Sequence, residues 1–125
     1  MSSTANFAAN PRSEVVTISA ANTNRDGTGT ITSAFTAGAN GSRLERIEIK
    51  ANGATTAGMV RLFKKKGAGA WKLWREYTVG AITPSASVAS FSALDDVIAE
   101  ILSSDIQIGA STHNAEGFEV HSSGG

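Results

Sequence analysis

The chain has 125 residues, 18% of them charged, with 11 Lys plus Arg against 11 Asp plus Glu and a formal net charge of zero. A chain of this length supports one hydrophobic core rather than two, so a single folded domain is predicted. The balanced charge gives no overall field that would attract nucleic acid or an anionic membrane, and neither partner is expected.

Cysteine is absent, which excludes disulfides, thiolate metal ligands and a cysteine nucleophile. No apolar stretch approaches the roughly 20 residues that a membrane-spanning helix needs. Residues 1–11 have neither the basic start nor the apolar centre of a secretory signal, so no export signal is predicted.

The first predicted element is an extended arm over residues 1–13. Phe7 is the one aromatic side chain of this segment, among Ser, Ala and Asn. Because such a segment cannot bury enough apolar surface to fold alone, it is predicted to lie along a neighbouring chain with Phe7 as an anchor. Pro11 and Arg12 are further candidate contact residues of the arm. The alternative is an arm folded back on its own domain.

The remainder, residues 14–125, is predicted to be an all-β domain. Apolar and polar side chains alternate, so that Ile47 and Ile49 share one face of a strand while Glu48 and Lys50 share the other. This period of two is typical of a strand with one buried and one wet face. Turn-forming pairs such as Asn-Gly and Asp-Gly separate the segments. The predicted strands span residues 14–20, 28–37, 43–51, 57–66, 70–79, 85–93, 105–112 and 117–122.

Eight short antiparallel strands around one core predict a two-sheet sandwich of the jelly-roll type, with a closed barrel as the second architecture. Residues 94–102 differ from the rest, because their apolar side chains recur at helical spacing. A short helix and an irregular β connection are both compatible with that segment.

The segment from Asn22 to Gly27 imitates the start of a calcium-binding loop, because oxygen-bearing side chains alternate and a glycine stands at the sixth position. The twelfth position is Ser33 instead of a bidentate Glu, and Arg25 adds a positive charge in the middle. The segment is therefore predicted to be a turn whose Asn and Asp side chains cap their own backbone, with Gly27 at positive φ.

Lys64, Lys65 and Lys66 form a predicted basic hairpin tip, and Trp71 and Trp74 follow it closely. Basic residues interleaved with aromatic ones are typical of a platform for single-stranded nucleic acid, but the zero net charge favours a solvated loop. Alternation predicts Trp71 on the apolar face of its strand and Trp74 on the polar face. An indole on a polar face indicates a contact surface, so Trp74 and the three lysines are candidate partner-binding residues. Burial of both strand faces is the alternative.

No catalytic constellation is predicted. Asp95 and Asp96 are neighbours in sequence and therefore point in different directions, and His113 and His121 lack the spacing of a metal site. The chain has no Gly-x-Ser-x-Gly motif and no phosphate-binding loop. We therefore expect no catalytic residue, no metal and no cofactor, and the chain is predicted not to be an enzyme.

Residues 22–30 and 36–47, together with residues 49–51 and 57–63, resemble a group of small virion proteins of tailed bacteriophages. The resemblance runs from Thr17 to the end of the chain, and its motifs are those of turns and strands rather than of a catalytic site.

The resemblance implies a non-enzymatic β-sandwich that decorates and cements the outer surface of a phage head. Its partners would be the major capsid protein and further copies of itself in a homotrimer, and it would be made in the bacterial host cytoplasm. A tail, neck or fibre component of the virion is one alternative function. A glycan-binding module built around Trp74 and the loop from Asn22 to Asp26 is another.

Overall fold

The computed structural model describes residues 12–96, 98 and 100–124. This part of the chain contains nine strands and no helix, which confirms the predicted fold class. The strands are β1 (Arg12–Ile18), β2 (Thr32–Thr36), β3 (Ser42–Ala51), β4 (Gly58–Lys66), β5 (Lys72–Val79), β6 (Ser92–Asp95), β7 (Glu100–Leu102), β8 (Ile106–Thr112) and β9 (Phe118–Gly124).

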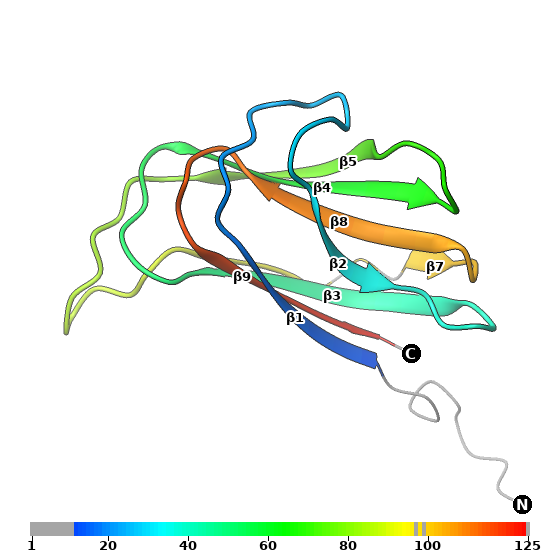
Figure 1. Ribbon diagram of the computed structural model, residues 1–125. Helices are drawn as coiled ribbons and strands as arrows, with labels where there is room; N and C mark the ends of the chain where they lie inside the picture. The colour runs from blue at the N-terminus through cyan, green and yellow to red at the C-terminus, as the bar shows by residue number, and fades with distance from the viewer. Residues whose placement is uncertain (1–11, 97, 99, 125) are drawn as a thin grey trace, which may run out of the picture.

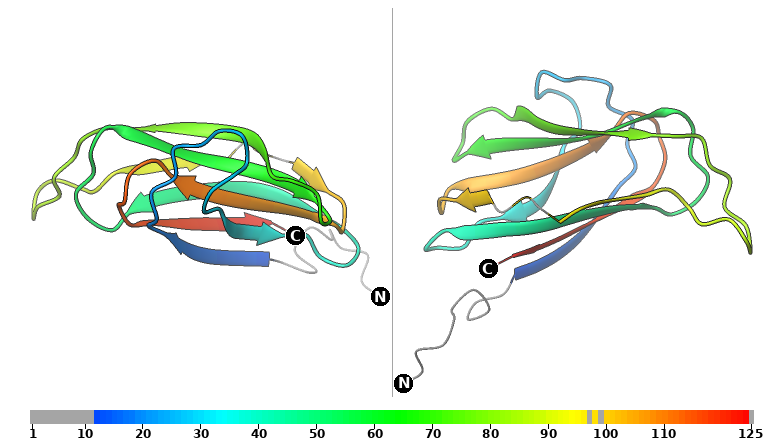
Figure 2. Two further views of the ribbon diagram at one scale, coloured as in Figure 1. Left: turned by 45° about the horizontal axis from the view of Figure 1, so that its top comes forward. Right: turned by 180° about the vertical axis from the view of Figure 1, so that it is seen from behind.

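The strands form two antiparallel sheets packed face to face, as Figure 1 and Figure 2 show. Sheet A has the order β1-β9-β3-β6, with β7 also paired to β3, and sheet B has the order β2-β8-β4-β5. β6 pairs with residues 47–50 of β3 and β7 with residues 42–44, so the two form one interrupted edge strand. If β6 and β7 are counted as one strand, each sheet has four strands. The chain then passes from one sheet to the other at every connection between strands, except in the β4–β5 hairpin. This arrangement confirms the jelly-roll-like sandwich expected from the sequence.

The core lies between the two sheets and is built from the alternating apolar side chains. In β3, Ile47 and Ile49 are buried, whereas Arg46 and Lys50 lie on the opposite, exposed face. The alternation predicted for this strand is therefore confirmed. The other large side chains that are fully buried in this core are Phe35, Leu44, Val60, Leu62, Val79, Leu102, Ile108, Phe118 and Val120.

The strand predicted over residues 85–93 is wrong, because regular pairing begins only at Ser92. Ser85 and Val88 instead exchange two backbone hydrogen bonds, with N–O distances of 2.9 and 3.3 Å, and so close a tight turn. Ser and Ala fill most of this segment and offer little apolar surface to hold it in a sheet. A local turn pairs backbone N–H and C=O groups of this segment with each other, without the neighbouring strand that a sheet would require.

The helix considered for residues 94–102 is wrong, and the β alternative is correct. Within the described residues of this segment, β6 and β7 each pair with β3. The helical spacing arises because the apolar side chains divide between two faces of an interrupted strand. Ile98 and Leu102 are buried, whereas Leu94 is 52% and Ile101 80% exposed.

Part of the outer face of sheet B, over β8, is covered by the chain segment between β1 and β2, which crosses over the sheet in Figure 1. Four consecutive residues of β4, Val60 to Phe63, are all buried, and Phe63 lies outside the central core. Gly109 of β8 leaves room for this cover, since a Cβ there would lie 2.6 Å from Ile31 Cγ2 and 2.8 Å from Trp71 Cη2. Residues 28–31, predicted as the start of a strand, belong to this covering segment.

Candidate functional site

The loop from Asn22 to Thr30 is organised by the buried Asn22 side chain. Its Nδ2 donates to the carbonyl oxygens of Thr28 and Thr30 at 3.0 and 2.9 Å, and its Oδ1 accepts from the Asn24 amide at 3.0 Å. The side chain therefore bonds to the backbone of its own loop, as predicted. Within the described residues, no group of three or more His, Asp or Glu side chains lies where it could hold a metal ion.

Asp26 completes this loop by accepting hydrogen bonds from Thr28, at 2.5 Å from its hydroxyl and 3.1 Å from its amide. These bonds favour the ionised carboxylate and lower the pKa of Asp26. Gly27 has a φ of 88°, as predicted, and a Cβ at that position would collide with the Trp71 carbonyl. The loop is thus a self-capped turn packed on the β4–β5 hairpin.

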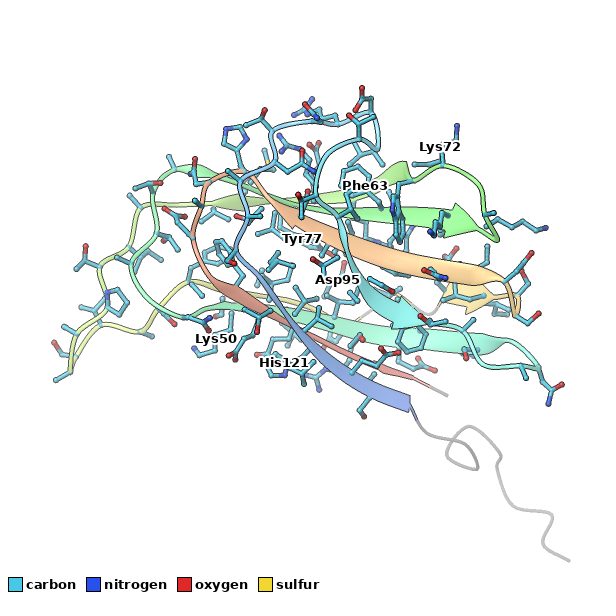
Figure 3. The ribbon with its side chains drawn as sticks, in the orientation of Figure 1. Lys50, Phe63, Lys72, Tyr77, Asp95 and His121 are labelled. Atoms are coloured by element: carbon cyan, nitrogen blue, oxygen red, sulfur yellow. The ribbon has the colours of Figure 1, made fainter. Side chains whose placement is uncertain are left out.

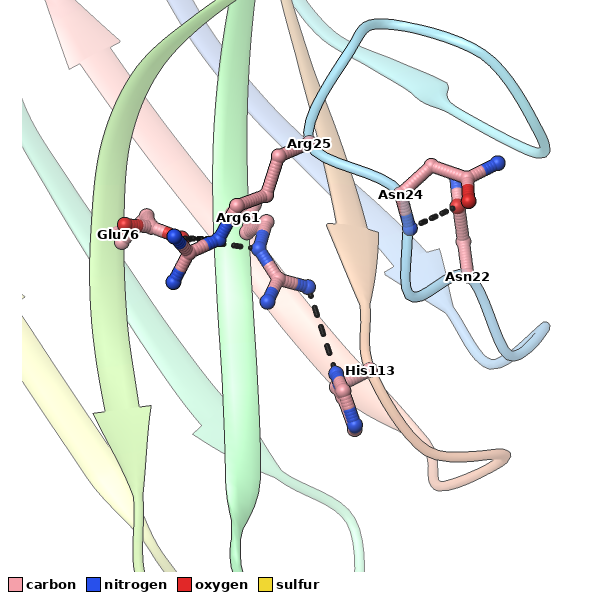
Figure 4. Close-up of polar contacts among 6 residues, drawn as sticks. All are labelled: Asn22, Asn24, Arg25, Arg61, Glu76 and His113. Carbon is pink, nitrogen blue, oxygen red and sulfur yellow. Dashed lines mark hydrogen bonds and ion pairs between the residues drawn. The ribbon is translucent and has the colours of Figure 1, made fainter.

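An ionic contact fixes the same loop to sheet B (Figure 4). The carboxylate of Glu76 on β5 lies 2.9 Å from Arg61 Nε on β4 and 3.0 Å from Arg25 Nε in the loop. The Arg61 side chain is only 5% exposed, and its Nη1 also lies 3.5 Å from His113 Nδ1. A buried cation needs such a partner to offset its desolvation, so this cluster acts as a structural clamp.

A β-bulge in the β4–β5 hairpin reverses the faces expected for the two tryptophans. Leu62 pairs with Arg75 and Phe63 with Leu73, which leaves Trp74 as the extra residue. Trp74 therefore packs against the central core, and Trp71 lies on the covered outer face beside Gly109. The prediction that Trp74 occupies the polar face is wrong. The glycan-binding alternative relied in part on an exposed Trp74 indole and loses that support.

The hairpin pocket is a hollow of about 370 Å³ between β4, β5, their connecting turn and the start of β8. Its lining includes Lys64, Lys65, Lys66, Lys72, Trp74 and Ile106. The structure thus brings together the four candidate residues that the sequence singled out in this hairpin, the three lysines and Trp74. Figure 3 shows Lys72 near the free end of the hairpin.

The cations of the hairpin pocket lie close to aromatic rings. Lys64 Nζ is 4.8 Å and Arg75 Cζ 4.7 Å from the centre of the Trp74 ring, and Lys65 Nζ is 4.7 Å from that of Trp71. Lys64 also reaches across to sheet A, where its Nζ lies 2.7 Å from a carboxylate oxygen of Glu100. Each of the two indole rings therefore already makes a cation–π contact with at least one side chain.

Beside the hairpin pocket, three polar side chains join the edges of the two sheets. Arg75 Nη1 and the Tyr77 hydroxyl of β5 both donate to Asp95 Oδ2 of β6, each at 3.1 Å. Figure 3 shows Tyr77 and Asp95 in the space between the sheets. Burial, followed by the negative charge of Asp95, raises the pKa of Tyr77 to about 12.

The outer face of sheet A is open, whereas a chain segment lies over part of the outer face of sheet B. Val15, His121, Glu48 and Leu94 form one cross-strand row over four of its strands, β1, β9, β3 and β6. Val15 is 59% exposed and Leu94 52%. Ile101 adds a third exposed apolar side chain opposite Arg43. Figure 3 shows Lys50 and His121 along this sheet.

The predicted arm residues Phe7 and Pro11 lie outside the described residues. Arg12 begins β1, two residues before the predicted start of the domain, and pairs with Gly124 of β9. Leu94 and Ile101 were not singled out as contact residues, because their spacing resembles that of a helix. Only the pairing with β3 shows that they lie on an open face.

Comparisons with protein-family models, with curated proteins and with solved structures found no match for this chain. Among the described residues, no helix is long and apolar enough to cross a membrane.

Proposed function

We propose that this chain is a non-enzymatic virion protein of a tailed bacteriophage that decorates and stabilises the capsid shell. It binds the major capsid protein and further copies of itself, as a homotrimer on the outer surface of the head. The resemblance of residues 22–30 and 36–47 to virion proteins supports the proposal. The jelly-roll order is compatible with it, since capsid domains use this order, but lectin domains and cupins use it too.

The open outer face of sheet A is the observation that carries the proposal. A protein that lies on a shell needs a broad, solvent-facing surface, and the outer face of sheet A offers one. Arg46 and Lys50 balance Glu48 and Glu119 on this face, so neighbouring copies repel each other little. Apolar side chains at both sides of the face supply the surface whose burial stabilises association.

Two substitutions on this face test the proposal. Arginine in place of Leu94 and Ile101 places two charges where apolar contact is expected, and shell binding should weaken about tenfold or more, which is about 1.4 kcal/mol or more. The matched control is Val88→Arg, because Val88 is also exposed, at 46%, but lies in the turn between β5 and β6. Binding to purified heads is measured by co-sedimentation. If the wild type, the double variant Leu94→Arg with Ile101→Arg, and the control Val88→Arg all bind equally, the outer face of sheet A is not part of the interface.

The arm is tested by deletion of residues 1–11, which leaves all nine described strands intact because β1 begins at Arg12. Shell binding should fall sharply while the thermal unfolding curve keeps its shape and midpoint. Full binding by the shortened chain would show that the arm, including Phe7, makes no contact with the shell.

The position in the virion is tested by counting copies in purified particles by quantitative mass spectrometry. A decoration protein should approach the copy number of the major capsid protein, whereas a tail, neck or fibre component should be far scarcer. Absence from the particles would overturn the proposed function as a whole.

A further inference from the structure

The hairpin pocket combines an apolar floor with a cationic rim. Trp74 and Ile106 pack against the core and form part of the floor, and Leu73 adds a side chain that is 38% exposed. A hollow of about 370 Å³ falls at the lower end of the range of ligand-binding pockets. An occupant with one compact apolar group would remove this surface from water.

The rim carries more positive charge than its own carboxylates neutralise. Of the four lysines that line the pocket, Lys64 alone has an ion-pair partner within the described residues, Glu100. Lys65 lies over an indole ring, and both Lys66 and Lys72 are exposed. Ammonium groups around an apolar floor favour an occupant that carries carboxylates beside an apolar side chain.

The strand beside the pocket favours an extended peptide as that occupant. β5 pairs only with β4, so its other edge has no strand partner within the described residues. An added strand would make backbone hydrogen bonds along this edge and direct alternate side chains to one face. The bulge at Trp74 turns the indole toward the floor at the same place, and bulges are over-represented beside binding sites.

Single-stranded nucleic acid fits the pocket less well. Base stacking needs an accessible ring face, whereas Lys64 and Arg75 already lie over Trp74, and Lys65 over Trp71. A base would have to displace these cations.

We propose that the hairpin pocket and the free edge of β5 bind an extended acidic segment of a partner protein, with an aliphatic side chain on the apolar floor and flanking carboxylates on Lys66 and Lys72. This inference goes beyond the proposed function and does not depend on it, because peptide binding is measured without virion particles. Failure of shell binding would therefore leave it unaffected, and its own failure would leave the shell interface of sheet A unaffected.

The test is calorimetric titration of the full chain with the peptide acetyl-Asp-Glu-Leu-Asp-Glu-amide. We expect saturable binding that weakens as salt is added, and about tenfold or more lower affinity for the double variant Lys66→Glu and Lys72→Glu. Lys50→Glu is the matched control, since Lys50 is an exposed strand lysine on the outer face of sheet A. It should change the affinity less than about twofold.

Peptide-induced NMR shifts should concentrate in residues 64–74 and at Ile106, and replacing the leucine of the peptide by serine should weaken binding. Lys66 and Lys72 are exposed, so we expect their replacement to leave the fold intact, and circular dichroism checks this. If the double Glu variant unfolds, the double variant Lys66→Gln with Lys72→Gln replaces it. Three results would each overturn the inference: no binding of the peptide, an equal loss in Lys50→Glu, or tighter binding of single-stranded oligothymidylate at the same lysines.

Discussion

Gly109→Ala tests whether the segment between β1 and β2 is packed on sheet B as tightly as the structure indicates. The added Cβ would lie 2.6 Å from Ile31 Cγ2, and 2.8 and 2.9 Å from two ring atoms of Trp71. All three distances are well below ordinary van der Waals contact. Extra volume in a packed site costs about 1–3 kcal/mol, and replacing a strand glycine by alanine returns about 0.5–1 kcal/mol.

Because all three contacts lie below 3.0 Å, the cost belongs in the upper half of its range. The expected net loss of unfolding free energy is therefore about 1–2.5 kcal/mol, which corresponds to a Tm lower by about 4–10 °C for a domain of this size. Urea unfolding and calorimetry measure it. Gly53→Ala is the matched control, because no atom lies within 4 Å of a Cβ there, and its stability should change by less than about 0.5 kcal/mol.

The same substitution in a Trp71→Phe background isolates the contact. The two Trp71 atoms nearest to the added Cβ, Cη2 and Cζ3, belong to the part of the indole that phenylalanine lacks. Gly109→Ala should then cost about 1 kcal/mol less than in the wild type, as a double-mutant cycle would measure. Equal costs in both backgrounds, or equal stability of Gly109→Ala and Gly53→Ala, would refute the packing described for this face.

Two further predictions concern charged groups. Glu76→Ala should lower the unfolding free energy by about 2–3 kcal/mol in urea titrations, because it leaves the buried Arg61 without its carboxylate, whereas Glu45→Ala, which breaks an exposed pair, should change it by less than about 0.5 kcal/mol. Tyr77, the one tyrosine, should ionise near pH 12 by ultraviolet absorbance, and Asp95→Asn should lower that midpoint toward 10.0. The pKa of Tyr77 is higher in the folded than in the unfolded chain. Its contribution to the free energy of unfolding should therefore be fully present below pH 10 and be lost as the pH rises toward 12.

The sequence predicts the β-sandwich well where one face of a strand is buried and the other wet. Ile47 and Ile49 show this, because a period of two leaves little doubt about strand type and facing. Trp74 shows the limit of the same rule: a one-residue bulge shifts the alternation for the rest of the strand, and nothing in the local sequence marks the extra residue.

The candidate site was predictable only in part. Lys64 to Lys66 and Trp74 do line one pocket. A hairpin places its two strands side by side, so residues near its turn are neighbours even where the predicted face of a side chain is wrong. Leu94 and Ile101 could not be recognised as surface residues, because an interrupted strand and a helix give similar apolar spacing over so few positions. The partner strand, which decides between them, lies about 50 residues earlier in the sequence.

The place of β9 between β1 and β3 has a consequence for synthesis. During translation β1 is made about 100 residues before β9, its neighbour in the sheet. Residues 12–18 must therefore remain without their strand partner until residues 118–124 have been made. Nascent chains stalled before residue 118 should consequently be far more sensitive to protease in that strand than released ones, and a newly made molecule is most open to capture by another during this interval.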